Sequence, residues 1–297
     1  MSTSSVETSS LQVLRAPPSL AKEEACGECA VTPPRPTGVH RRFDRTARLL
    51  GEPAMERLAR ATVAVFGLGG VGSFAVEGLA RAGTGGLRII DFDRVCVTNS
   101  NRQLHALKGT YGKSKAAVMA ERLRLIHPEL RLDVREEFYE QANSDRMLDP
   151  LPDLVIDAID NLKAKMHLIT TCLQRGVPIV SCMGAAGRLD PTKVRVADLS
   201  STTNDPFANE LRKLLKRKHG LDCTRETGVR AIYSLEKPIA PQSLSYDEDG
   251  FTCVCPHGQN DHHTCDHRNR IEGSVGFVTS VFGMACAGEA VRLLTKK

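Results

Sequence analysis

The sequence TVAVFGLGGVG, residues 62–72, decides the fold. Its first five residues have the composition of a short buried strand, a GxGxxG turn follows at once, and helical sequence continues to about Ala82. Glycines let the backbone turn tightly and bring the N–H groups at a helix start close to a phosphate. The turn is therefore predicted to bind nucleotide phosphates through Gly67, Gly69, Gly70 and Gly72.

Strand and helix patterns alternate along the chain that follows this turn. Further strands are expected at 87–90, 131–135, 154–156 and 178–181, and further helices at 113–126 and 162–175. Such alternation predicts an α/β fold: a doubly wound, Rossmann-like, mostly parallel sheet. Beyond Asp190 the pattern changes to a strand at 193–198, a basic helix at 207–218 and an irregular region at 223–272. We expect this part to form a C-terminal strand and helix extension.

The residues after the second strand indicate which nucleotide is bound. Asp91 ends that strand, about 20 residues past the glycine turn, where a carboxylate accepts hydrogen bonds from ribose hydroxyls. A dinucleotide-dependent oxidoreductase or a non-catalytic nucleotide-binding module would share these features. Next come Arg102 in NSNRQ and Lys115 at the start of the following helix. Displacing pyrophosphate requires such cations beside the phosphates, whereas hydride transfer does not, so ATP is favoured.

Two aspartates mark the end of the strand at 154–156. They belong to the sequence Asp157-Ala-Ile-Asp160-Asn161. Ligands of open α/β sheets bind outside the carboxyl ends of the strands, so Asp160 is predicted to hold Mg²⁺ against the triphosphate. Asp157 lies further back along the strand and is expected to be structural.

The composition is that of a globular protein with reduced thiols. The chain has 297 residues, 41% hydrophobic, with ten cysteines and a formal net charge of +5. No signal peptide pattern precedes the cysteines, which favours an intracellular protein in the cytoplasm, with mitochondria as the alternative. Residues 1–40 are predicted to be a disordered leader, and 41–297 the folded domain. The apolar stretch 274–287 is expected to be a core helix rather than a membrane span.

A segment near the C-terminus is rich in metal-binding side chains. Residues 253–267 contain three cysteines and four histidines, of which Cys253, Cys255, His257 and Cys265 are a candidate zinc set. The favoured interpretation is an irregular polar insertion at about 250–270 that binds no metal.

Taken together, these motifs resemble the ubiquitin-activating-enzyme superfamily (ThiF/MoeB/HesA-like), whose members adenylate carboxylates. The matching segments are Arg42-Phe43, Arg48-Leu49, GLGGVG, Asp91, NSNRQ, Lys115 and DAIDN. The resemblance implies ATP as ligand, with Asn99, Arg102, Gln103 and Lys115 near its phosphates and Mg²⁺ on Asp160. It also implies a homodimer in which Arg48, or alternatively Arg45, reaches the ATP of the partner subunit.

Within the superfamily, longer segments resemble the tRNA threonylcarbamoyladenosine dehydratases. They are RFDRTARLLG (42–51), DFDRVCVTNSNRQLHAL (91–107), GKSKAAVMAERLRLIHPE (112–129), LVIDAIDN (154–161) and GAAGRLDPTKVRVADLSSTTNDPFANELRKLLK (184–216). This resemblance implies adenylation of the threonyl carboxylate on a modified adenosine of tRNA, followed by ring closure. The alternative is an activator of a ubiquitin-like or sulfur-carrier protein.

A basic segment bears on the choice between a nucleic-acid and a protein substrate. Residues 212–218 hold five basic side chains in seven, and Arg225 and Arg230 could extend the patch. They either form an ordinary solvated helix face or contact the phosphate backbone of tRNA.

Overall fold

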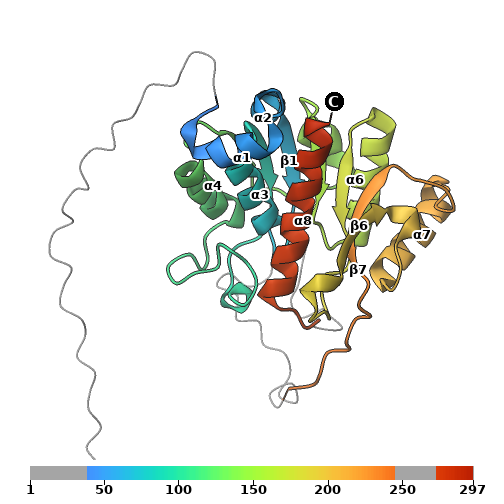
Figure 1. Cartoon of the computed structure of the whole chain (residues 1–297). Helices are drawn as coiled ribbons and strands as arrows, with labels where there is room; N and C mark the ends of the chain where they lie inside the picture. The colour runs from blue at the N-terminus through green and yellow to red at the C-terminus, as the bar shows by residue number, and fades with distance from the viewer. Residues whose placement is uncertain (1–38, 245–271, 297) are drawn as a thin grey trace, which may run out of the picture. The chain divides into compact units, whose positions relative to one another are not determined.

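The computed structural model describes residues 39–244 and 272–296, which form a seven-stranded sheet covered by helices (Figure 1). The strand order is β3-β2-β1-β4-β5-β7-β6, and every neighbouring pair is parallel except β6 with β7. The strands are β1 (Thr62–Phe66), β2 (Gly86–Ile90), β3 (Arg131–Arg135), β4 (Leu154–Asp157), β5 (Ile179–Cys182), β6 (Val194–Asp198) and β7 (Val229–Ser234). The doubly wound, mostly parallel α/β fold expected from the sequence is confirmed.

One strand lies where the sequence pattern indicated irregular structure. β7 falls inside 223–272, yet it is an inner strand that pairs with β5 on one side and β6 on the other. Its second residue, Arg230, interrupts the apolar pattern that a buried strand normally shows. The structure compensates for this charge, because the Nε of Arg230 lies 2.6 Å from a carboxylate oxygen of Glu289. The expectation of an irregular region at 229–234 is therefore wrong.

Helices cover both faces of the sheet. The core on one face contains buried residues of α3, α4 and α8, and the core on the other contains residues of α5, α6 and α7 (Figure 1). The helices are α1 (Asp44–Leu50), α2 (Glu52–Arg60), α3 (Gly72–Ala82), α4 (Lys115–Ile126), α5 (Ser144–Leu148), α6 (Leu162–Arg175), α7 (Pro206–His219) and α8 (Gly276–Thr295), with short 3-10 turns at Arg41–Phe43, Val97–Asn99, Gln141–Asn143, Pro191–Lys193 and Leu199–Ser201.

The apolar helix α8 belongs to the core. By length and composition alone it could cross a membrane. However, Val278 and Phe282 are fully buried, and small residues bring the helix close to α3. A Cβ added at Gly283 would lie only 2.3 Å from the carbonyl oxygen of Val71, so the contact requires glycine there. The apolar stretch at 274–287 therefore lies mostly in a core helix, as expected, and that helix spans Gly276–Thr295.

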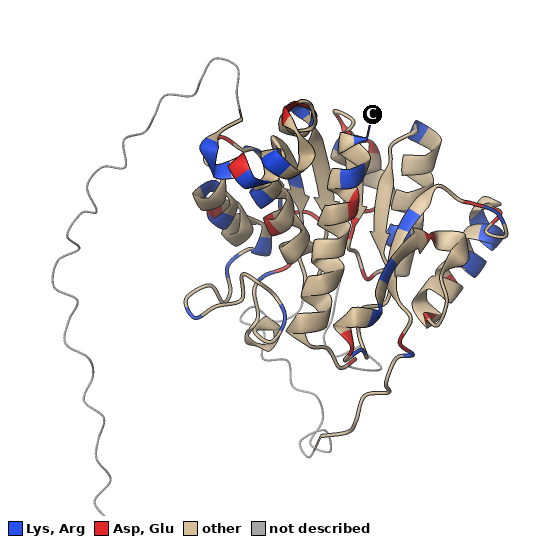
Figure 2. Ribbon diagram, in the orientation of Figure 1, with Lys and Arg blue, Asp and Glu red and all other residues tan. Residues whose placement is uncertain are grey.

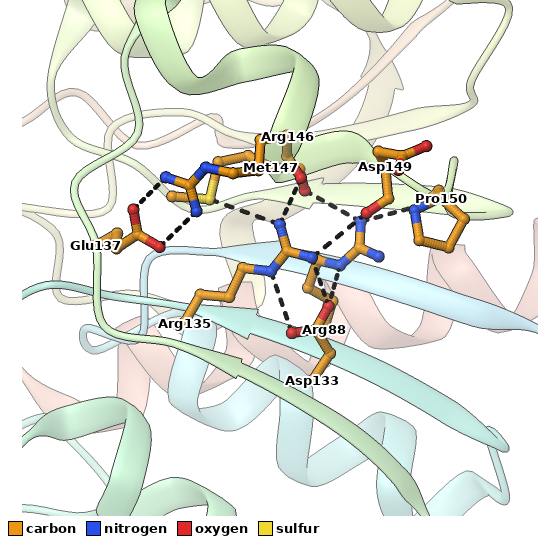
Figure 3. A network of polar contacts seen from close by, with 8 residues as sticks. All are labelled: Arg88, Asp133, Arg135, Glu137, Arg146, Met147, Asp149 and Pro150. Carbon is orange, nitrogen blue, oxygen red and sulfur yellow. Dashed lines mark hydrogen bonds and ion pairs between the residues drawn. The ribbon is translucent and has the colours of Figure 1, made fainter.

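Hydrogen bonds made by the buried Arg88 side chain hold strands β2 and β3, at one edge of the sheet, to the segment around α5 (Figure 3). The Nε of Arg88 donates to Asp133 at 2.6 Å, and its Nη1 donates to the carbonyl oxygens of Met147 and Pro150. Arg135 also bonds Asp133, at 2.8 Å. We call Arg88, Asp133 and Arg135 with these partners the Arg88 network. It joins β2 and β3 to the segment around α5.

Candidate nucleotide site

The turn after β1 has a geometry that only glycine allows at two positions. Gly67 has φ +88°, in the left-handed region that glycine favours. A Cβ at Gly72 would lie 1.8 Å from the carbonyl oxygen of Gly67, closer than any packing permits. The glycines thus let the first turn of α3 fold directly onto the end of β1. Backbone N–H groups at such a helix start provide a site for phosphate.

Asp91 lies beside this turn and fixes it. Its Oδ2 accepts a hydrogen bond from the Leu68 N–H at 2.6 Å, and its Oδ1 accepts one from the Asp93 N–H at 2.8 Å. Burial raises the pKa of the Asp91 carboxyl, and the charge on Lys115 opposes this rise without cancelling it. A carboxylate has about four acceptor positions, so Asp91 retains the capacity to bind ribose hydroxyls.

Lys115 is a buried ammonium surrounded by carboxylates. Its Nζ lies 2.8 Å from Asp93 Oδ2, and its backbone N–H donates to the Asp93 carbonyl oxygen at 3.0 Å. Burial alone would lower the pKa of this ammonium. The charges of Asp91 and Asp93 raise it by more, Asp160 adds to the effect, and the net pKa lies above its ordinary value. Lys115 therefore carries a permanent positive charge beside the glycine turn.

Asp93 was missed in the sequence, although the pattern contained a signal for it. In the run Asp91-Phe92-Asp93 the two aspartates are two residues apart, a spacing that places side chains on the same face of extended chain. Both act on Lys115.

The NSNRQ segment forms a compact loop over the glycine turn. Asn99 Oδ1 accepts from the Cys96 N–H at 3.1 Å, and the Asn99 carbonyl accepts from the N–H groups of Arg102 and Gln103. Asn101 Nδ2 donates to the Ser274 carbonyl at 2.8 Å, which anchors the loop to the start of α8. Asn99 consequently shapes the loop, a role that the sequence did not indicate.

Arg102 and Gln103 lie next to the glycines. A Cβ at Gly70 would be 3.2 Å from Arg102 Cγ, and one at Gly69 would be 3.9 Å from Gln103 Nε2. The Arg102 Nη1 donates to the Thr98 carbonyl at 3.1 Å. The structure therefore brings the glycine turn, Asp91, Lys115, Arg102 and Gln103 close together.

Two buried polar side chains on this loop have unused hydrogen-bonding capacity. Among the described residues, Gln103 Oε1 and both ring nitrogens of His105 have no hydrogen-bond partner. Burial lowers the pKa of His105 to about 4, with a contribution from the charge of Lys115, so the ring is neutral near pH 7. A lone histidine carries no recognisable pattern, so sequence reasoning missed His105. Buried polar atoms without partners suggest that a ligand or water binds here.

The two aspartates at the end of β4 have different surroundings. Asp160 is exposed at the carboxyl edge of the sheet, within electrostatic reach of Lys115. Asp157 is fully buried and bonds Lys165, Ser181 and the Ile159 N–H. The structural role expected for Asp157 is confirmed.

Arg48 does not approach the nucleotide site of its own chain. It is exposed on α1, where its Nε bonds Asp44 at 2.9 Å. α1 and α2 precede β1, and the Leu58 carbonyl of α2 accepts from Gly85 just before β2 begins. These helices therefore lie at the amino ends of the strands, opposite the glycine turn (Figure 1). Arg45 lies on the same helix.

The basic residues of α7 divide into two groups. Lys213, Lys216, Arg217 and Lys218 are exposed. Figure 2 marks the Lys and Arg positions of the chain in blue. Arg212 instead donates to the carbonyl oxygens of Leu199 and Thr202, so it is a structural residue. Arg230, expected to extend this patch, is paired with Glu289 and does not do so, whereas Arg225 is exposed in the loop after α7.

The part of the chain that the structure describes contains no group of three or more His, Cys, Asp or Glu residues arranged to hold a metal ion. The zinc candidates Cys253, Cys255, His257 and Cys265 lie outside the described residues, as do residues 1–38 of the predicted leader and the whole 250–270 insertion.

The geometry of a nucleotide-binding α/β domain agrees with the comparisons to known proteins. Residues 43–297 match the family model described as "ThiF family". The chain is 40% identical over 263 residues to the tRNA threonylcarbamoyladenosine dehydratase of Escherichia coli, which spans 86% of this chain and 94% of that protein. The chain belongs to the ThiF family, in the branch of the tRNA threonylcarbamoyladenosine dehydratases.

A second relative aligns with this chain over the same share of both sequences. The tRNA threonylcarbamoyladenosine dehydratase of Bacillus subtilis is 39% identical over 254 residues, again covering 86% of this chain and 94% of the relative. Among solved structures, the E. coli dehydratase TcdA in complex with ATP superposes with a TM-score of 0.73 at 38% identity, covering 85% of this chain and 93% of that one. The resemblance inferred from the sequence motifs is thereby confirmed.

Proposed function

We propose that this chain dehydrates N6-threonylcarbamoyladenosine in tRNA, using ATP to adenylate the threonyl carboxylate. The observation that carries the proposal is the buried, charged Lys115 beside Asp91 and the glycine turn, in a chain that matches the dehydratases over nearly their whole length. Hydride transfer has no use for such a cation, whereas pyrophosphate displacement does.

The ribose and the phosphates of ATP have residues that fit them. Asp91 would accept hydrogen bonds from the ribose hydroxyls, and the N–H groups of the glycine turn would bind phosphate oxygens. Gln103 and His105 supply polar atoms whose hydrogen-bonding capacity is unused among the described residues. Lys115 and Arg102 would neutralise the charge that moves onto pyrophosphate as it leaves.

Magnesium fits the same edge of the sheet. Mg²⁺ in nucleotide enzymes is bound by one or two carboxylates together with substrate phosphates rather than by an all-protein cage. An exposed carboxylate at the carboxyl end of β4 meets that requirement, so Asp160 is the residue that would hold the ion. When bound, Mg²⁺ would offset charge on the phosphate oxygens.

The reaction then has two steps. A carboxylate oxygen of the threonyl group attacks the α-phosphorus of ATP, forming an acyl-adenylate as the bond to pyrophosphate breaks. A nucleophile of the same modified base next attacks the acyl carbon, closes a ring and releases AMP with the former carboxylate oxygen. The net change in the nucleoside is the loss of one water. An internal nucleophile is already near its target, so proximity removes the need for a cysteine that carries the acyl group.

The partners follow from the same proposal. tRNA would contact the exposed lysines and arginine of α7 through phosphates, which positions the substrate without reading its sequence.

Because Arg48 lies far from the site of its own chain, we propose a homodimer in which it completes the site of the other subunit. Arg48→Ala and Lys115→Met proteins, each inactive alone, would then regain activity when mixed.

We propose the cytoplasm as the compartment in which the protein acts.

ATP–pyrophosphate exchange tests the proposed function against its alternative. Exchange should require tRNA that carries threonylcarbamoyladenosine and should not occur with the same tRNA lacking the modification. A ubiquitin-like or sulfur-carrier protein ending in Gly-Gly should not replace it. Exchange supported by such a protein, and not by modified tRNA, would contradict the proposal.

A further inference from the structure

A completely buried ion pair lies behind the turn that carries Asp160. The Nζ of Lys165, on α6, is 2.7 Å from the Oδ2 of Asp157, the last residue of β4, and both side chains are 0% exposed. Burying two charges is costly, and an apolar replacement of similar volume often gives equal or greater stability. Stabilisation of the fold is therefore a weak explanation for the presence of this ion pair.

The pair joins several elements of the sheet edge. Ser181 of β5 donates to Asp157 Oδ2 at 2.6 Å, and Lys165 Nζ donates to the carbonyl oxygen of Cys182 at 2.9 Å. The ring of Phe207, at the start of α7, lies 5.8 Å from the same ammonium, within cation–π range. One buried charge pair thus links β4, β5, α6 and α7.

The second carboxylate oxygen of Asp157 reaches the turn at 158–160. Asp157 Oδ1 accepts from the Ile159 N–H at 3.1 Å. On its other side the turn contacts the glycine turn and the end of β1. The Ala158 N–H donates to the Phe66 carbonyl oxygen at 2.9 Å, and a Cβ at Gly67 would be 2.8 Å from the Ala158 carbonyl oxygen. Just beyond it, Asn161 Oδ1 caps α6 by accepting from the N–H groups of residues 163 and 164.

We propose that the Asp157–Lys165 pair is a positioning unit that fixes the Ala158–Asp160 turn, and with it the Asp160 carboxylate and the wall beside Gly67. The inference rests on the proposed function, because it takes Asp160 as the carboxylate that faces Mg²⁺ and ATP. Both side chains are completely buried, so neither Asp157 nor Lys165 offers surface that a nucleotide could contact.

Three variants test the pair: Asp157→Asn, Lys165→Met and the two combined. The matched control is Arg88→Met with Asp133→Asn, which removes another ion pair with a buried arginine, 2.6 Å long, from the Arg88 network. The measurements are binding of a fluorescent ATP analogue at increasing Mg²⁺ concentration, and hydrogen exchange of the amides at 158–161.

In each test variant we expect the Mg²⁺ concentration for half-maximal ATP binding to rise about tenfold, as when a residue that orients a metal ligand is lost. The Ile159 amide should exchange faster. The combined variant, which has no unpaired buried charge, should keep this defect while folding well. The control should lose stability with an unchanged Mg²⁺ dependence.

The inference is overturned if the folded combined variant shows wild-type exchange at 158–161 and wild-type Mg²⁺ dependence. The exchange readout requires no nucleotide, so it decides the inference separately from the proposed function. The latter fails if the wild-type protein does not bind ATP. If the single variants do not fold, Ser181→Ala removes one bond to Asp157 but keeps both charges, and it should change the exchange and the Mg²⁺ dependence in the same direction by a smaller amount.

Discussion

Two buried polar regions at the carboxyl edge of the sheet differ in how their hydrogen bonds are used. Around Asp157 and Lys165, both carboxylate oxygens and the ammonium group have hydrogen-bond partners in neighbouring protein groups. At the glycine turn, Gln103 Oε1 and the His105 ring nitrogens lack partners within the described residues. Because native proteins rarely leave buried polar atoms without partners, the second region is suited to bind a ligand and the first to support it.

The largest effect is expected on folding stability, from removing one member of the Asp157–Lys165 ion pair. Lys165→Met or Asp157→Asn leaves one charge buried alone and should lower the free energy of unfolding by about 3–5 kcal/mol. The combined variant should recover part of that loss. Urea unfolding measures both. Equal stability of the single variants and the wild type would show that this pair is not a buried charge pair in solution.

Lys115 tests the ligand-binding region. Lys115→Met should reduce the rate of ATP–pyrophosphate exchange by about 100-fold or more, the usual cost of removing one group that stabilises developing charge. Lys113→Met is the control, since Lys113 is exposed two residues earlier. Comparable exchange rates for both variants would show that Lys115 is not part of the ATP site.

His105 gives the comparison a pH dependence. Its pKa is about 4 in the folded protein, below the ordinary value of about 6.5 in the unfolded chain. Between these values the unfolded chain binds the proton and the folded protein does not, so stability is complete above pH 6.5 and falls as the pH drops toward 4. From pH 7 to pH 5 the wild type should lose about 2 kcal/mol more than His105→Leu. Parallel pH profiles in urea unfolding would contradict the buried, neutral ring.

Helix α7 shows a similar contrast between a bonded and an exposed basic residue, and here we expect the smallest effects on stability and on tRNA binding. Arg212 is bonded to backbone carbonyls, so Arg212→Ala should lower stability and leave the salt dependence of tRNA binding unchanged. Lys216→Ala should preserve stability and reduce the slope of log affinity against log salt by about 1, as expected for one lost phosphate contact. An unchanged slope after substitution of Lys216, Arg217 and Lys218 together would exclude this surface as the tRNA contact.

Local sequence predicted the parts of the fold and site that depend on neighbouring residues. The glycine turn, Asp91 and Lys115 follow a strand-turn-helix pattern whose geometry is set within a few residues, and the structure brings them together. β7 was missed because Arg230 breaks its apolar pattern, and the partner that neutralises it, Glu289, is 59 residues away.

Tertiary contacts decide the remaining residues. His105 and Lys165 are ordinary polar residues in the sequence, and only packing shows that the first lacks partners and the second pairs with Asp157. Arg212 and Lys216 look alike on one predicted helix, yet one is fixed by carbonyls and the other is exposed. The spacing of Ala208, Leu211 and Leu215 indicates which face of that helix is buried, but only the structure shows that Arg212 reaches the carbonyl oxygens of Leu199 and Thr202.

The most direct test of the central claim is mass spectrometry of nucleosides from threonylcarbamoylated tRNA incubated with the protein, Mg²⁺ and ATP. The proposed function predicts that the modified adenosine loses the mass of one water, that the loss requires ATP, and that AMP is released. An unchanged nucleoside, with ATP still bound by the protein, would contradict the claim and point instead to a protein substrate with a Gly-Gly tail.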